Sequence, residues 1–492
     1  MSLLLVGLCL LAVIAVYFGN NPMHHGRWFL TRRFINWFPL GMSYAFLYMA
    51  RYNLNVSKNA LGTLMTKEDF GMIFAAGTFV YAFSFLINGP LVDKIGGKKG
   101  IIISCIGSAL ANIALGVLTY MMIQGRLGKG VVPVFSVVYG INMYFQSYGA
   151  VSIIKVKAYW FHVRERGVFG AIFGTLISFG VYFAFDWGQS IVEMSDANYS
   201  GGGQWLHNLI RSAFAVDGAP GQAIWAVFFI PALLLVFWAV LDAWLIKDLP
   251  EEAGFEPFDT HDASSGQMHV EYTTGQLIKR VFTSRLMMLF AAIELCTGVL
   301  RNGIYQWYFI FAKEVPQPGA EFILKNWGLL LCFFGIVGGF TGGLLSDKVF
   351  QSRRGPPAVF LCAFMFIMTI LMAFSLYRSP WLLGVGAVMI SMAVIGVHSL
   401  MSGTAAADFG GRKATATSMG IVDGFVYLGS GLQSVSLGFL TSWNWHSWPL
   451  FLMPFALIGV WLSWKIWHDL PEATRRYVAE KENRPIPEPE PF

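Results

Sequence analysis

Thirteen apolar runs, most of them long enough to cross a lipid bilayer as a helix, occupy more than half of the chain. A bilayer-spanning helix needs about 20 mainly apolar residues. Only 13% of the 492 residues are charged, whereas an ordinary soluble domain carries about a quarter. The pattern predicts an all-α membrane protein and excludes a water-soluble enzyme. The runs lie near residues 1–19, 36–60, 71–92, 100–123, 131–156, 167–187, 223–246, 285–312, 327–347, 356–377, 381–403, 413–440 and 447–468.

The order of the runs predicts a division into five parts. The first run has no basic residue before it and no small-x-small cleavage pattern after it, which favours an uncleaved extra span over a removed signal peptide. Twelve runs then fall into two groups of six. We therefore expect an extra transmembrane segment at 1–22, a six-helix half at 23–246, a cytoplasmic loop at 247–284, a second six-helix half at 285–470 and a cytoplasmic tail at 471–492.

The basic residues predict the orientation of the core. Of the 34 lysines and arginines, 24 fall on one side when alternate loops are sorted and seven on the other, with three inside or at the end of apolar runs. Loops rich in lysine and arginine remain on the cytoplasmic side of a membrane, so we expect the twelve-helix core to begin and end in the cytoplasm. The net charge of +6 then follows from topology and needs no nucleic-acid partner. A bacterial plasma membrane is the favoured location, with an internal membrane of a eukaryotic cell as the alternative.

The five cysteines show neither a disulfide framework nor the spacing of metal ligands, since all lie in or beside apolar runs without Cys-x-x-Cys or Cys/His clusters. No phosphate-binding Walker loop occurs, so nucleotide hydrolysis by this chain is not predicted. We expect no metal, no cofactor and no enzymatic activity.

A motif recurs after the second and the eighth core runs. Its spacing is Gly-x-x-x-Asp-Lys, with further basic residues behind it, and the two aspartates are 254 positions apart. The glycine allows close helix packing, and the carboxylate can accept hydrogen bonds from neighbouring helix ends. We interpret the motif as a gate between helices, with a charged turn that only fixes orientation as the alternative. Its residues are Gly89, Asp93, Lys94, Gly343, Asp347 and Lys348.

Two arginines recur with nearly the same offset, 250 positions, on the first helix of each half. Arginine inside a membrane helix is costly unless it faces a polar site. Helical spacing places each arginine on a polar stripe. The stripe on the first core helix holds Tyr44, Tyr48, Arg51, Asn55 and Lys58, and the stripe on the seventh holds Glu294, Gly298, Arg301, Tyr305 and Tyr308.

Two guanidinium groups facing one site suit a doubly charged tetrahedral anion, because each can grip two oxygens. Phosphate or a phosphate ester fits best. The alternative is internal pairing, for instance of Arg301 with Glu294 or of Arg51 with Asp423. Matching positions in both halves favour a shared ligand. Asp186 and Asp423 could bind protons or pair with Arg51 and Lys58, and Lys58 could be a third cation of the site or snorkel to the surface.

The repeated motif resembles the loop signature of the major facilitator superfamily, over residues 30–470. The arginines resemble those of its organophosphate:phosphate antiporters, the carriers of glycerol 3-phosphate and hexose 6-phosphate. Further similarity lies in Phe145-Gln146, in Glu165-Arg166-Gly167, in Gly396-Val397-His398, in Ile421-Val422-Asp423-Gly424 and in Tyr427-Leu428-Gly429. The chain departs from the glycerol-phosphate carrier at Phe85, Ile177 and Cys332, where that carrier has lysine, histidine and glutamate.

The resemblance implies a major facilitator fold, with two six-helix halves that rock about a midplane site. It implies exchange of a small phosphorylated metabolite for inorganic phosphate by a monomer, with Gln146 and His398 near the substrate. A lone membrane histidine more often bonds another helix. Two other functions stay open. One is a membrane sensor of sugar phosphate, and the other is proton-coupled symport of an organic anion through Glu294, Asp186 or Asp423.

Overall fold

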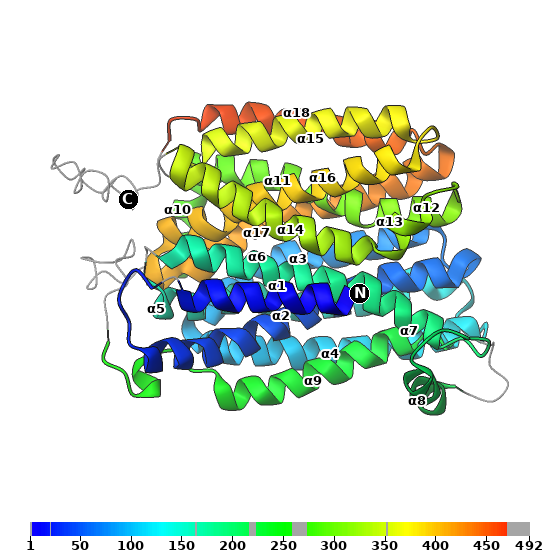
Figure 1. Ribbon diagram of the computed structural model, residues 1–492, viewed down its shortest axis with the longest axis horizontal. Helices are drawn as coiled ribbons and strands as arrows, with labels where there is room; N and C mark the ends of the chain where they lie inside the picture. Colours follow the sequence, from blue (N-terminus) through cyan, green and yellow to red (C-terminus); the bar gives the residue numbers. More distant parts are fainter. Residues whose placement is uncertain are drawn as a thin grey trace.

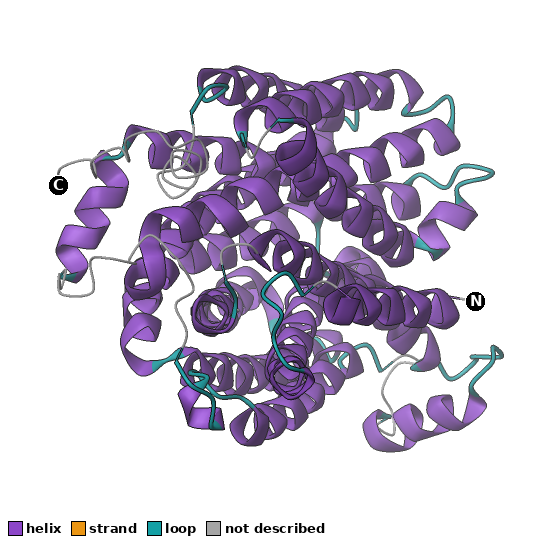
Figure 2. Ribbon diagram, turned by 60° about the vertical axis from the view of Figure 1, so that its left-hand side comes forward, coloured by secondary structure: helices purple, strands orange, loops and turns teal. Residues whose placement is uncertain are grey.

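The computed structural model describes residues 2–19, 21–162, 165–215, 223–257, 273–350 and 353–469. Helices joined by short loops make up this part of the chain, and no strand occurs in it (Figure 2). The helices form two layers whose long axes run roughly parallel (Figure 1). Helices α2 to α9 form one layer and helices α11 to α18 the other, as expected for two halves.

The first half consists of six long helical segments. One of them continues through a π-helical turn, η4 (Phe183–Trp187), which joins α6 to α7. The helices are α2 (Arg27–Leu61), α3 (Lys67–Ile95), α4 (Gly97–Ile123), α5 (Val131–Trp160), α6 (Arg166–Tyr182), α7 (Gly188–Met194) and α9 (Ala226–Leu245).

The second half repeats this plan. Its helices are α11 (Arg285–Tyr305), α12 (Trp307–Glu314), α14 (Trp327–Leu344), α15 (Gly355–Ser375), α16 (Pro380–His398), α17 (Ala406–Trp443) and α18 (Ser447–Lys465), with π-helical turns η6 (Leu345–Val349) and η7 (Ser399–Ala405). Four peripheral helices are α1 (Ser2–Gly19), α8 (Gln204–Phe214), α10 (Thr274–Thr283) and α13 (Glu321–Lys325).

All thirteen apolar runs fall on helices, and among the residues with a described structure eight helical segments are long and apolar enough to cross a membrane. The count of twelve core spans plus one extra span stays a prediction, as do the five segment boundaries. The eight segments are Lys67–Ile95, Gly97–Ile123, Ala226–Leu245, Arg285–Glu314, Trp327–Leu344, Gly355–Ser375, Pro380–Ser402 and Ser447–Lys465.

Some helix ends differ from the predicted runs. Helix α2 begins at Arg27, nine residues before the predicted run at 36, because its polar first turns bury Arg33 against Glu165. Residues 188–222, which lie between the sixth and seventh apolar runs, are not wholly a loop, since α7 and α8 lie within this stretch. Apolar content alone misses such ends, because tertiary contacts stabilise polar turns.

Helix α17 contacts the other half along most of its length, and small residues allow this. A Cβ atom at Gly71 of α3 would lie 2.5 Å from the carbonyl oxygen of Ser434, and one at Gly89 would lie 3.1 Å from that of Ala416. Within the second half, a Cβ at Gly298 of α11 would lie 1.9 Å from the carbonyl oxygen of Val426. Glycine thus brings α3, α11 and α17 together, and α11 carries one of the two polar stripes.

The two halves are connected at both ends of the bundle. We name the end near α10 the inner end and the end near α8 and α13 the outer end, following the predicted orientation (Figure 1). At the inner end, Thr417 of α17 donates from its hydroxyl to Asp93 of α3 at 2.8 Å. At the outer end, Glu314 of α12 pairs with Lys67 of α3 at 2.9 Å and with Lys58 of α2 at 3.6 Å.

Helix α1 is attached to the first half by a buried polar network. The Tyr17 hydroxyl donates to the carbonyl of Leu30 at 2.8 Å and accepts from Nε of Arg33 at 3.0 Å. Both terminal nitrogens of Arg33 donate to Glu165 at 2.9 Å. Burial alone would raise the pKa of Glu165, but the hydrogen bonds of His25 and Arg33 and the charge of Arg33 lower it to about 2.

Candidate anion site

Arg51 of α2 is fully buried, and three other helices hold its guanidinium group. Nε donates to Oε1 of Gln146 on α5 at 2.8 Å, and Nη2 donates to the hydroxyl of Tyr81 on α3 at 3.1 Å. Nη1 donates to the hydroxyl of Tyr427 on α17, which belongs to the other half. All three acceptors are uncharged, so the arginine is oriented while its positive charge remains uncompensated by them.

Arg301 of α11 is 2% exposed, and its Nε and Nη2 have no hydrogen-bond partner among the residues that the structure describes. The centre of its guanidinium lies 5.5 Å from the centroid of the Tyr427 ring, and that of Arg51 lies 5.1 Å from the same centroid. An unpaired buried donor costs about 1–3 kcal/mol, and more when it is charged. An acceptor of negative charge beside Arg301 would remove this cost.

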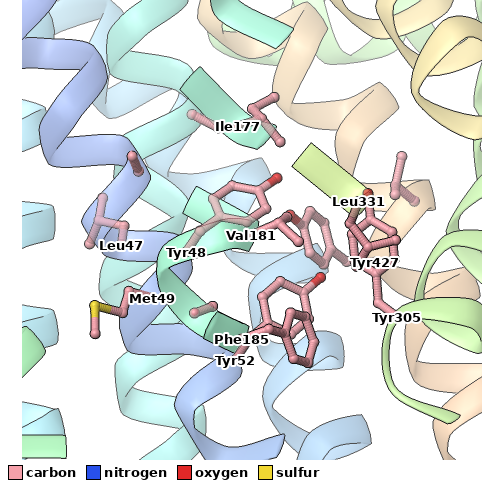
Figure 3. Close-up of a cluster of buried hydrophobic side chains, with 14 of the residues drawn as sticks. Leu47, Tyr48, Met49, Tyr52, Ile177, Val181, Phe185, Tyr305, Leu331 and Tyr427 are labelled. Carbon is pink, nitrogen blue, oxygen red and sulfur yellow. The ribbon is translucent and has the colours of Figure 1, made fainter. Parts of the chain in front are cut away.

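Aromatic side chains surround the two arginines. Figure 3 shows Tyr48 and Tyr52 of α2 facing Tyr305 and Tyr427 of the second half. The Arg51 guanidinium lies 4.8 Å from the Tyr48 ring centroid, and the Tyr52 hydroxyl donates to Oδ1 of Asn302 across the boundary between halves at 2.7 Å. The rings exclude water and bulk lipid from the charges, and a low dielectric strengthens any ion pair formed there.

The internal ion pairs considered from the sequence are not formed. Neither arginine lies within 4 Å of a carboxylate oxygen in the part of the chain that the structure describes. Glu294 instead pairs with His398 of α16 at 3.0 Å, and Asp423 accepts a hydrogen bond from Ser402. Pairing with a carboxylate is therefore not what keeps the arginines in place.

Several other predicted site residues lie next to the arginines. The Tyr44 and Tyr48 rings meet edge to face at 5.3 Å, and the Tyr305 hydroxyl lies 3.5 Å from the hydroxyl of Ser391. Asn55, one turn beyond Arg51, is fully buried, and within the described ranges neither its side-chain oxygen nor its side-chain nitrogen has a hydrogen-bond partner. Asn55 is thus a further group that can serve a ligand.

Lys58 and Asp186 lie in other contacts, which corrects the pairing considered from the sequence. Lys58 pairs with Glu314 at the outer end. The carboxylate of Asp186 accepts from the backbone N–H groups of Gly328 and Leu329, at 2.8 and 3.1 Å, in the first turn of α14. A carboxylate is favoured at a helix N-terminus. Neither residue therefore contacts the arginines.

The first copy of the repeated motif joins the halves at the inner end. Asp93 pairs with Lys155 of α5 at 3.0 Å and accepts from both the backbone N–H and the hydroxyl of Thr417. Gly89 lies against α17, as its close approach to Ala416 shows, while Lys94 is exposed. The carboxylate therefore links three helices, two from one half and one from the other.

The second copy differs in its packing. A Cβ at Gly343 would meet nothing within 4 Å, whereas one at the preceding Gly342 would lie 2.7 Å from the carbonyl oxygen of Gly396 on α16. The close approach thus falls one residue earlier than in the predicted motif. The side chains of Asp347 and Lys348 lie outside those that the structure describes.

The site residues predicted from the sequence do not include Tyr52, Tyr81 and Tyr427, which the structure places beside the arginines. Tyr427 lies four residues after Asp423 on α17, so helical spacing places the two on one face. That spacing was a usable signal. Tyr81 carries none, because its contact with Arg51 depends on how α3 and α2 pack.

A family comparison identifies the fold. The family model described as Major Facilitator Superfamily matches residues 40–434. The chain belongs to the major facilitator superfamily. Solved structures of the superfamily share the fold. A bacterial homolog of the human lysosomal transporter Spinster, inward-facing and unoccupied, has a TM-score of 0.66 at 12% identity and covers 90% of this chain and 98% of its own. The transporter FucP, in the outward conformation, has a TM-score of 0.58 at 16% identity, with 87% and 98% covered.

Curated relatives within the superfamily confirm the resemblance to the organophosphate carriers. The glycerol-3-phosphate transporter of Bacillus subtilis is 23% identical over 80% of this chain and 83% of its own. A probable hexose phosphate transport protein of Chlamydia pneumoniae is 22% identical, with 89% and 92% covered. The membrane sensor protein UhpC of Salmonella typhimurium is 23% identical, with 82% and 84% covered. This major facilitator protein is thus an integral, multi-pass membrane protein.

Proposed function

We propose that this major facilitator protein exchanges a small phosphorylated metabolite for inorganic phosphate across the membrane. One observation carries the proposal. Arg51 and Arg301, one from each half, are buried beside the same tyrosine ring, neither is paired with a carboxylate, and Arg301 has two unpartnered donor nitrogens. Two buried positive charges, one of them with unpartnered donors, favour a bound oxyanion.

A phosphate group matches this arrangement better than a carboxylate does. Its oxygens point in several directions, so one phosphate can accept from guanidinium groups on opposite halves, while a carboxylate presents its two oxygens in one plane. At neutral pH a phosphate ester carries a charge of about −1.5 to −2, which suits two arginines. Unpartnered Asn55 supplies a donor and an acceptor for the remainder of the ligand.

Alternating access follows from an anion held by both halves. The halves contact each other at the inner end through Asp93 and Thr417 and at the outer end through Glu314, Lys58 and Lys67. In the proposed cycle one set of contacts opens while the other stays closed, and the anion between the arginines accompanies each rocking step. Gly89, Asp93 and Lys94 form the inner gate, and Gly343, Asp347 and Lys348 form its counterpart in the second half.

The relatives support a phosphorylated metabolite as the substrate. Proteins named glycerol-3-phosphate transporter and hexose phosphate transport protein align over most of the chain. We place the protein in a bacterial plasma membrane with both ends of the core in the cytoplasm. One chain contains both arginines, so a monomer is sufficient for the activity.

The test is transport by purified protein in liposomes. Vesicles loaded with inorganic phosphate should take up a labelled phosphate ester from a panel of glycerol, hexose and glycerate phosphates. Vesicles without internal phosphate should take up little. Arg51→Lys and Arg301→Lys should each abolish uptake, and Arg126→Lys, in an exposed loop, should not. Uptake that does not need internal phosphate would contradict exchange.

A sensor of sugar phosphate is the second candidate, because relatives named membrane sensor protein UhpC match at 21–23% identity. The same liposomes separate the two functions. A sensor would bind a phosphate ester tightly with little flux, whereas the exchanger shows both binding and flux.

A further inference from the structure

A buried cluster of ionisable side chains lies on the inner side of Arg301, and the exchange proposed above does not use it. Glu294 is two helical turns before Arg301 on α11, is fully buried, and pairs with Nδ1 of His398 at 3.0 Å. Asp423 of α17 is 4% exposed and accepts from Ser402. The cluster thus joins three helices, α11, α16 and α17, of the second half.

One oxygen of this cluster is left without a donor. The hydroxyl of Thr297 donates to Oε2 of Glu294 at 2.6 Å, and His398 contacts the same oxygen. Oε1 of Glu294 is buried and has no hydrogen-bond partner in the described part of the chain. An ionised carboxylate with one unsolvated oxygen is costly in a low dielectric. A proton on Oε1 would remove that cost.

Titratable groups face Glu294 from its own helix and from three others. His398 faces it from α16, Asp423 from α17, and the thiols of Cys296 and Cys362 from α11 and α15. Arg301 faces both His398 and Asp423. The cluster and the arginine therefore influence each other electrostatically, although no ion pair joins them.

The charges of the site lead to a prediction about protons. Arg51 and Arg301 contribute two positive charges, and Glu294 and Asp423 contribute two negative charges when ionised. A bound phosphate dianion would add two further negative charges to this buried region. Charges of one sign are costly to accumulate where the dielectric is low. Protons from the water on the open side would lower this cost by binding to His398 and to Glu294.

We propose that the Glu294–His398 pair is a proton site, and that the protein takes up protons there when a phosphate ester binds between Arg51 and Arg301. This inference rests on the proposed function, because it needs an anion at the arginines. Binding and protonation then stabilise each other, as linkage requires. A proton carried with the anion would make its transport depend on the pH gradient, although internal phosphate would still be required.

The experiment measures protons and ligand together. Purified protein in weakly buffered solution at pH 7.5 is titrated with glucose 6-phosphate, while a pH indicator reports proton uptake and calorimetry reports binding. The ligand is then mostly dianionic, since the second pKa of a phosphate ester is about 6. The wild type should take up about one proton per bound anion.

Three variants locate the proton. In Glu294→Gln and in His398→Gln, proton uptake per bound anion should fall at least twofold, while binding is retained. Glu321→Gln, an exposed glutamate of α13, is the matched control and should behave like the wild type. If a variant does not fold, the wild type alone still tests the inference. Because proton uptake accompanies binding, the affinity of the wild type for glucose 6-phosphate must fall as pH rises from 7.5 to 8.5.

Each contrary result has its own meaning. Binding without proton uptake by the wild type overturns this inference and leaves the proposed function standing. Proton uptake that is unchanged in both variants places the proton on the phosphate or elsewhere and also overturns it. Failure of the wild type to bind any phosphate ester overturns the proposed function, and this inference falls with it.

Discussion

Arg51 donates a hydrogen bond from Nη1 to the hydroxyl of Tyr427, across the boundary between the two halves of the molecule. The ring of Tyr427 also lies beside Arg301, with the guanidinium centre 5.5 Å from its centroid. One side chain of α17 therefore contacts both arginines. Movement of either half relative to the other must change the contact between Tyr427 and Arg51, so Tyr427 couples the candidate anion site to the packing of the halves.

Tyr427→Phe should weaken the binding of phosphate esters by about tenfold, since a hydrogen bond to a charged group contributes about 1.5–3 kcal/mol. The ring, and its contact with both guanidinium groups, would remain. Isothermal titration measures the effect. Tyr120→Phe, on α4 and against Trp225, is the control and should bind normally. An unchanged affinity in Tyr427→Phe would show that its hydroxyl does not orient Arg51 for the anion.

Asp93→Asn should loosen the inner end of the bundle. The variant loses the ion pair with Lys155 and weakens the bonds from Thr417. Hydrogen–deuterium exchange should become at least about tenfold faster at the inner ends of α3 and α17 and stay unchanged at their outer ends. Lys99→Gln alters an exposed lysine at the start of α4, outside the proposed gate, and should have no such effect. Equal rates of hydrogen–deuterium exchange in both variants would show that Asp93 does not hold the inner gate closed.

The sequence predicted the general arrangement of the site because membrane helices obey simple rules. Apolar runs located the helices, and the 250-residue offset placed Arg51 and Arg301 in equivalent positions of two halves. Both rest on spacing along the chain, which helix geometry converts into a shared face. The sequence could therefore identify which arginines lie inside.

The partners of the arginines could not be predicted in the same way. Tyr81 and Tyr427 meet Arg51 only because α3 and α17 pack closely at glycines, and their rotation about their axes is set by that packing. The same reason explains why Glu294 pairs with His398, 104 residues away, and not with Arg301 on its own helix. It also explains why Gly342, rather than Gly343, makes the close contact with α16.

The Arg33–Glu165 pair should stabilise the protein over a defined pH range. The pKa of Glu165 is lowered from 4.5 to about 2 in the folded protein. A lowered acid pKa stabilises the fold above the unfolded pKa, and this stabilisation is lost as pH falls toward the folded pKa. Breaking a buried pair costs about 3–5 kcal/mol, so Glu165→Gln should melt at a clearly lower temperature.

Thermal unfolding at several pH values tests this prediction. The difference in Tm between wild type and Glu165→Gln should be constant from pH 8 to about pH 5 and should shrink below about pH 4.5. Glu251→Gln, an exposed glutamate of the loop after α9, is the control. A difference that shrinks already between pH 8 and 6 would contradict the lowered pKa of Glu165.

The central claim is that one oxyanion is held by Arg51 and Arg301 together, and equilibrium binding of a phosphate ester to both lysine variants tests it most directly. Lysine keeps the charge but loses the two-pronged donor geometry of the guanidinium group. Arg51→Lys and Arg301→Lys should each weaken binding by roughly 100-fold, while Arg126→Lys binds as the wild type does. Wild-type affinity in either site variant would contradict the claim.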